Sequence, residues 1–267
     1  MATNVLNMLR LPLCLLLACC LTAALAAQPI AIPARDADRG DRPRLLNEDQ
    51  VNHIKIYEVD LSTRPRITIE DEVLEEFLRE FASNDNVPKG RADQREFMRA
   101  EGYVQLAKFF EVRARDYYGK ALMRGEPDSM RAWHRIHDGY IAEYFRPFFA
   151  VGQVEELALF ERTRDRTRDR VSYTNFYILT QIRVGGVPMI DRDRPEESLI
   201  LQWGLPREDA KFPAPEVPNW EPYFRNTEDQ RYQLVVEWIK TLIIANRNTD
   251  YGITYRVPNY RRPAENE

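Results

Sequence analysis

The sequence predicts a mainly α-helical domain over residues 46–246, with a small β element near residues 53–69. Two observations support this fold class. The 267-residue chain is 44% hydrophobic and 30% charged, the balance of an ordinary folded protein. Apolar residues also recur at helical spacing from Val73 to Phe81, from Tyr103 to Ala121 and from Tyr232 to Ile243. These stretches predict one helix of about 12 residues from Asp71, one from about Gly102 to Met123, and one near the C-terminus.

The β element is predicted from two short stretches. Residues His53–Asp60 (HIKIYEVD) alternate between apolar and polar, which is typical of a strand. Residues Pro65–Ile69 form its partner strand or lead into the next helix.

The second half of the domain begins with a helix from Pro127 to Phe145, because proline suits a first helical turn. Residues Tyr173–Ile182 are apolar without a clear period, so they are either a strand or a buried helix. Gly185 and Gly186 predict a turn. The last helix should begin at a capping box formed by Thr227 and Gln230, reach about Ala245, and pack Trp238 against the Pro127–Phe145 helix.

The N-terminus has the pattern of an export signal. Residues 1–26 contain Arg10, a short apolar run and the small residues Ala24 and Ala26, which predicts a cleaved signal peptide and a periplasmic or secreted protein. Residues 27–45 then form a flexible linker, and residues 247–267 a polar tail. The alternative is a lipoprotein acylated at Cys19, which would bring the chain to a membrane.

Cleavage would leave a mature domain without cysteine, because Cys14, Cys19 and Cys20 all precede residue 27. Such a domain has no disulfide, thiolate nucleophile, zinc-thiolate site or covalently attached haem. The net charge of −4 argues against a nucleic-acid partner. The common catalytic motifs are absent from the sequence, and this predicts a non-catalytic protein. A hydrolase that uses paired carboxylates remains a further alternative, because folding can bring distant members of the 42 Asp and Glu together.

The best candidate metal site is the HRIHD stretch, where His134, His137 and Asp138 fall close together on one helix. A stable metal site needs three or four ligands, so a hydrogen-bonded pair of packed histidines is the preferred interpretation. A second alternative is haem, with one of these histidines and Met189 as axial ligands.

A tandem TRDR repeat offers a candidate partner-binding surface. If the stretch is extended, alternate side chains share one face. The basic residues of the repeat would then contact a protein partner in the cell envelope. These residues are Arg162, Arg164, Arg166, Arg168 and Arg170. The alternative is a solvated loop in which Asp165 and Asp169 offset part of the charge.

Several stretches together resemble exported cytochrome-c-like proteins of the planctomycete type. The resemblance covers most of the mature chain and is clearest over about residues 126–246. It rests on the order and spacing of YTNF (173–176), PEESL (195–199), GLPRED (204–209), FPAPEVPNW (212–220) and VEWI (236–239).

The resemblance implies that this chain has lost its haem site. In the family, a helix ending in Gly-aromatic-Ile, here Gly139–Ile141, leads into two haem-binding cysteines and a histidine. Those positions fall on Phe145, Ala150 and Val151, and the distal ligand position falls on Ala214. Phe145, Phe148 and Phe149 are bulky enough to help fill the vacated space. The resemblance therefore implies an exported binding or scaffold protein without a cofactor. The alternative is an electron-transfer protein that holds haem or a metal non-covalently.

Overall fold

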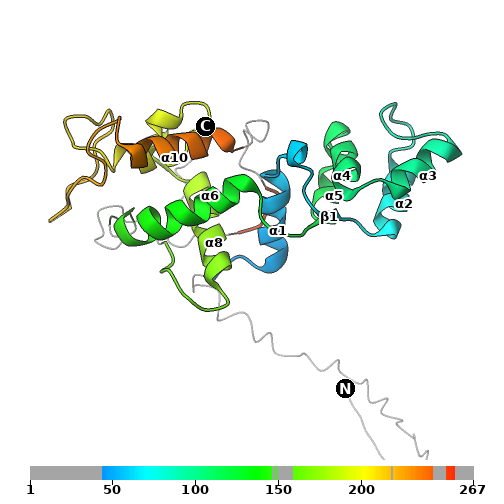
Figure 1. Cartoon of the computed structure of the whole chain (residues 1–267), viewed down its shortest axis with the longest axis horizontal. Helices are drawn as coiled ribbons and strands as arrows, with labels where there is room; N and C mark the ends of the chain where they lie inside the picture. The colour runs from blue at the N-terminus through cyan, green and yellow to red at the C-terminus, as the bar shows by residue number, and fades with distance from the viewer. Residues whose placement is uncertain (1–43, 146–147, 149–158, 218, 243–250, 256–267) are drawn as a thin grey trace, which may run out of the picture. The chain divides into compact units, whose positions relative to one another are not determined.

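The computed structural model describes residues 44–145, 148, 159–217, 219–242 and 251–255. These residues form a mainly helical structure with two short antiparallel strand pairs (Figure 1). The predicted helical class is confirmed. The predicted signal peptide, Cys19 and nearly all of the predicted linker lie outside the described residues. Among the described residues, we find no helix that is both long and apolar enough to span a membrane.

The strand predicted over His53–Asp60 is wrong, because this stretch belongs to helix α1 (Glu48–Tyr57). Its start is a capping box: Asn47 Oδ1 accepts from Gln50 N at 2.8 Å, and Gln50 Oε1 accepts from Asn47 N at 2.9 Å. Its buried positions lie at helical spacing and are Val51, Ile54, Ile56 and Tyr57. An apolar–polar alternation over eight residues was too short to exclude helical periodicity.

The stretch Pro65–Ile69 does contain a strand, one of the two outcomes predicted for it, but the partner of this strand is not His53–Asp60. Strand β1 (Ile67–Thr68) follows a 3-10 turn, η1 (Leu61–Thr63), and pairs antiparallel with β2 (Leu122–Met123). The predicted helix from Gly102 to Met123 is therefore wrong after its first half. Helix α4 (Gly102–Glu111) ends near Arg113, whose φ of 57° is left-handed, and α5 (Arg115–Tyr118) is short.

The helix predicted from Asp71 is confirmed as α2 (Asp71–Glu80). Helix α3 (Arg91–Arg99) was not predicted, because Phe97 is its only buried residue and the stretch is otherwise largely polar. Phe77 of α2 packs in an aromatic cluster with Phe97 of α3, Phe109 of α4 and Tyr117 of α5. Burial of these rings is what holds the four short helices together.

The predicted Pro127–Phe145 helix is confirmed, with an unexpected change of winding. It starts as α6 (Asp128–Ile136) and continues as a π-helix, η2 (His137–Phe145). Four of its buried residues follow each other at intervals of four and place one stripe against the core; they are Trp133, His137, Ile141 and Phe145. π-helical turns are rare and often occur at functional sites.

Helix α10 (Gln230–Thr241) lies beside α6, as Figure 1 shows. The predicted contact is confirmed: Trp238 stacks on Trp133 with ring centroids 5.0 Å apart, and its Nε1 donates to Ser129 O at 3.0 Å. The predicted capping box at Thr227 is wrong. Asp229 caps the helix instead, accepting from Arg231 N at 2.9 Å. The predicted end near Ala245 lies outside the described residues.

Residues 173–181 belong to helix α8 (Arg168–Gln181), so of the two alternatives for Tyr173–Ile182 the buried helix is confirmed. Every residue from Val171 to Thr180 is buried, which is why the sequence shows no one-sided period. The turn at Gly185 and Gly186 is confirmed, with φ of 57° and 82°, and it joins β3 (Arg183–Val184) to β4 (Val187–Pro188). Two short helical turns follow, η3 (Pro195–Glu197) and α9 (Leu199–Gln202).

Within the segment predicted as a polar tail, the structure describes residues 251–255, and Tyr251 is buried there. Its hydroxyl donates to Glu58 Oε1 at 2.7 Å and accepts from Arg192 Nη2 at 2.6 Å. Arg192 also pairs with Glu58 at 2.6 Å. This buried polar group fixes residues 251–255 against the end of α1.

Candidate functional site

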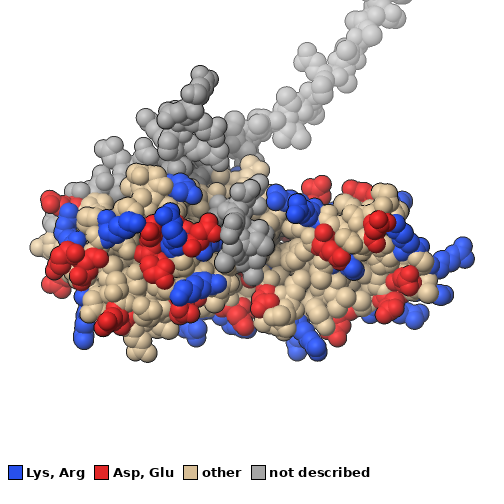
Figure 2. All heavy atoms as spheres, turned by 90° about the horizontal axis from the view of Figure 1, so that it is seen from above, with Lys and Arg blue, Asp and Glu red and all other residues tan. Residues whose placement is uncertain are grey.

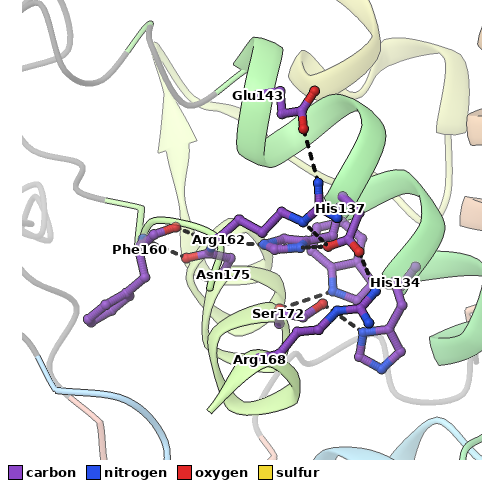
Figure 3. Close-up of polar contacts among 10 residues, drawn as sticks. His134, His137, Glu143, Phe160, Arg162, Arg168, Ser172 and Asn175 are labelled. Carbon is purple, nitrogen blue, oxygen red and sulfur yellow. Dashed lines mark hydrogen bonds and ion pairs between the residues drawn. The ribbon is translucent and has the colours of Figure 1, made fainter. Parts of the chain in front are cut away.

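His137 lies at the start of the π-helix and is only 1% exposed. Its Nε2 accepts a hydrogen bond from Asn175 Nδ2 at 2.9 Å, and its Nδ1 lies 3.2 Å from Asp138 Oδ1 (Figure 3). Because Nε2 faces a donor and Nδ1 faces a carboxylate, the neutral ring carries its proton on Nδ1. Both ring nitrogens of this predicted metal candidate are therefore engaged within the protein.

Asn175 of α8 fixes the orientation of the histidine. Its Oδ1 accepts from Phe160 N at 2.8 Å, and its Nδ2 donates to Phe160 O at 2.9 Å as well as to His137. The two backbone contacts determine which end of the amide is oxygen. One buried side chain thus joins α8, the segment at Phe160 and the π-helix (Figure 3).

Two arginine side chains contact Asp138 at the edge of this network. Arg168 Nη2 donates to Asp138 Oδ2, and Arg162 Nε lies 3.5 Å from Oδ1. Arg162 also pairs with Glu143 at 3.0 Å. Arg162 and Arg168, both labelled in Figure 3, contact Asp138 from different segments, since Arg168 begins α8 and Arg162 precedes it.

The predicted one-sided arginine strip is wrong. Arg168 and Arg170 lie in the first turn of α8, so the stretch is not extended throughout. Arg170 donates to Leu46 O at 2.7 Å, while Arg162 and Arg168 contact Asp138. Arg164 and Arg166 are exposed, and no ion pair connects them to other described residues. The repeat divides into residues that hold the fold and residues that face solvent.

His134, one turn earlier, belongs to a second polar group. Its Nδ1 lies 2.8 Å from Ser172 Oγ, and its Nε2 lies 3.7 Å from Glu126 Oε2. Glu126 pairs with Lys55 at 2.6 Å and accepts from the Tyr173 hydroxyl. Among the residues that the structure describes, no group of three or more potential ligands is arranged to hold a metal ion.

The surroundings of these groups shift their pKa values. Burial lowers the pKa of His137 from 6.5 to about 4, and this effect exceeds the opposing influence of Asp138. Burial acts to raise the pKa of Asp138, but hydrogen bonds from Arg168 and His137 outweigh it and hold this pKa below its ordinary value. The site therefore combines a neutral imidazole with an ionised carboxylate.

The predicted former haem pocket is described at three positions. Phe145, Phe148 and Ala214 are 0%, 1% and 2% exposed, while Phe149, Ala150 and Val151 lie outside the described residues. Trp203 packs on both rings, with centroids 5.7 Å from Phe145 and 5.8 Å from Phe148. Phe145 and Phe148 are thus part of a buried aromatic cluster, and Ala214 is a core residue.

Two residues beside these positions were missed by sequence reasoning. Asn175 had a usable signal, because an amide inside the apolar run YTNFYIL must find buried partners. Gly204 had none. A Cβ there would lie 2.4 Å from Phe224 Cε2 and 2.6 Å from Tyr140 Oη, so only glycine lets the two rings approach.

Comparison with known proteins adds no assignment: no protein family, no curated protein and no solved structure matches the chain.

The network predicts a specific dependence of stability on pH. Unfolding returns the pKa of His137 from about 4 to 6.5, so the unfolded chain takes up a proton that the folded chain refuses in this interval. The contribution of neutral His137 is complete above pH 6.5. As the pH falls from 6.5 to 4, the free energy of unfolding should lose about 3 kcal/mol through this group.

Urea unfolding of wild type and His137→Gln at several pH values measures this loss. Gln keeps an acceptor for Asn175 but does not titrate, so its stability should fall less over the same interval. Leu234→Ala, at a position 60% exposed, removes no titratable group and should parallel wild type. Parallel curves for wild type and His137→Gln would contradict the assignment.

Proposed function

We propose that this chain is an exported, non-catalytic binding or scaffold protein, built on a cytochrome-c-like domain that has lost its haem. Export rests on the predicted signal in residues 1–26, which would deliver the domain to the periplasm or the exterior. Acylation at Cys19 is the alternative and would tether it to a membrane.

The observation that carries the proposal is the packing at the expected haem positions. A covalently held haem needs thiols, and its iron needs nitrogen, sulfur or oxygen ligands. Phe145 and Ala214 offer none of these, and both are buried. Phe145 also stacks on Trp203 at 24° between ring planes, so aromatic side chains occupy the space around it. The residues at these positions do not fit the cofactor.

Arg164 and Arg166 are the proposed contacts for a protein partner in the cell envelope. Their exposure and their lack of a carboxylate partner among the described residues leave both guanidinium groups available to an acidic surface. Arg162, Arg168 and Arg170, in contrast, have partners within the fold. Elsewhere, acidic and basic side chains are interspersed over the face drawn in Figure 2, an arrangement that does not favour nucleic acid.

The cofactor claim is tested on protein exported from a host that attaches haem. We expect the purified chain to show no Soret band and no stoichiometric metal, and added haemin to separate from it on gel filtration. A Soret band that stays with wild type and disappears in His137→Gln would instead establish the electron-transfer alternative, with His137 as the ligand.

The partner claim is tested by pull-down from native envelope extract. The double variant Arg164→Ser/Arg166→Ser should lose the partner that wild type recovers. The control Arg95→Ser/Arg99→Ser removes equal charge from exposed positions on α3 and should recover it fully. Equal recovery of the partner by both double variants would contradict the proposed contact. Replacing Arg162 or Arg168 is avoided, because that change would also disturb Asp138.

A further inference from the structure

A concavity of about 740 Å³ lies where η1, the β1–β2 pair, the start of α6 and the end of α10 meet. This volume falls within the range of sites that hold small ligands. Its lining is rich in charge and includes Asp60, Arg66, Arg124, Asp128, Ser129 and Lys240.

Arg66 and Arg124 stand directly opposite each other on this lining. Ile67 pairs with Met123 in the β1–β2 register, and Arg124 N donates to Arg66 O at 2.8 Å just beyond it. Opposed residues of an antiparallel pair project to the same side. Met123 is buried, so the alternate positions 66 and 124 face away from the core. Both arginines are exposed, and two like charges in this relation repel each other.

Three of the four carboxylates that line the concavity have a cationic partner within the fold, and the fourth, Asp60, accepts from the backbone. Glu58 pairs with Arg192 and Tyr251, and Glu126 pairs with Lys55 and Tyr173. Asp60 Oδ1 caps η1 by accepting from Ser62 N at 2.9 Å. Asp128 pairs with Arg131 of its own helix.

The other cations of the lining are also paired. Arg131 contacts Asp128, and Lys240 contacts Glu237 at 2.9 Å. Among the described residues, no ion pair or side-chain hydrogen bond connects Arg66 or Arg124 to a carboxylate. Within the described part of the chain, these two guanidinium groups are therefore the cations of the lining that have no carboxylate partner.

The backbone just before Arg66 adopts an unusual conformation. Arg64 has φ of 51°, in the left-handed region that residues other than glycine seldom adopt, and Pro65 follows it. This turn directs the chain from η1 into β1 and so delivers Arg66 opposite Arg124. Such local strain concentrates at binding sites.

We propose that Arg66 and Arg124 bind an oxyanion in this concavity, supplied by a small molecule with a phosphate, sulfate or carboxylate group. An anion between the two guanidinium groups would accept paired hydrogen bonds from each and remove their repulsion. This inference is independent of the proposed function, since it uses neither the former haem positions nor the TRDR repeat.

Isothermal titration calorimetry of the mature chain tests the site, with sodium phosphate, sodium sulfate and sodium succinate as separate probes at constant ionic strength. We expect saturable binding of at least one probe at one site per chain, and the order of affinities identifies the class of anion. Arg66→Gln and Arg124→Gln should each weaken binding about tenfold or more. The control Arg135→Gln, at an exposed position on α6, should bind as wild type does.

A second readout separates binding from folding. In chloride buffer, Arg66→Gln and Arg124→Gln should melt at the same temperature as wild type or above it, because each removes a repulsion. The bound probe should raise the melting temperature of wild type and Arg135→Gln but not of the Arg66 and Arg124 variants. Failure of all three probes to saturate, or equal binding by every variant, would overturn the proposal.

Discussion

The structure depends on one helix, from Asp128 to Phe145, which carries large side chains into several parts of the core. Near its start, Trp133 stacks on Trp238 of α10, and its Nε1 donates to Ser172 O of α8 at 3.0 Å. At its end, Phe145 packs among Phe148 and Trp203. Between them, the π-helical turn keeps the buried side chains on one stripe. Dispersion and apolar burial along this helix bring α8, α9 and α10 together.

His137 lies in the middle of this helix, and its burial requires the polar network around it. A buried imidazole must have its nitrogens satisfied, and Asn175 and Asp138 satisfy them. Asp138 in turn needs Arg162 and Arg168, which brings the TRDR repeat onto the helix. The charged repeat and His137, which look separate in the sequence, belong to one structural unit (Figure 3).

Elements with a one-sided apolar stripe were predictable from the sequence. Helices α2 and α10 bury one face each, and the contact of Trp238 with the Asp128–Phe145 helix followed from its place on such a face. Sequence periodicity left α8 undecided between strand and helix and did not predict α3. Helix α8 is buried all round, so it lacks the contrast that periodicity detects, whereas α3 has only Phe97 buried and carries few apolar residues in a polar stretch.

Other features were decided by single residues or by distant partners. The left-handed Arg113 ends α4 where the apolar pattern continues, and Ile67 of β1 pairs with Met123, 56 residues later in the chain. For the candidate site, the sequence identified His134, His137 and Asp138 correctly as neighbours. The amide inside an apolar run signalled that Asn175 needs buried partners, but the sequence could not show that these partners are His137, 38 positions away, and Phe160, 15 positions away.

The proposal of a haem-less domain requires that protein side chains fill the space around Phe145, an expected haem position. Urea unfolding of Phe145→Ala measures this packing, with Leu122→Ala, at a position 52% exposed, as the control. If Phe145 fills a packed core, its truncation should lower the free energy of unfolding by about 3 to 5 kcal/mol. The control should lose only about 0.5 kcal/mol. A loss for Phe145→Ala no larger than that of the control would contradict the claim, because it would mean that the ring occupies loosely packed space.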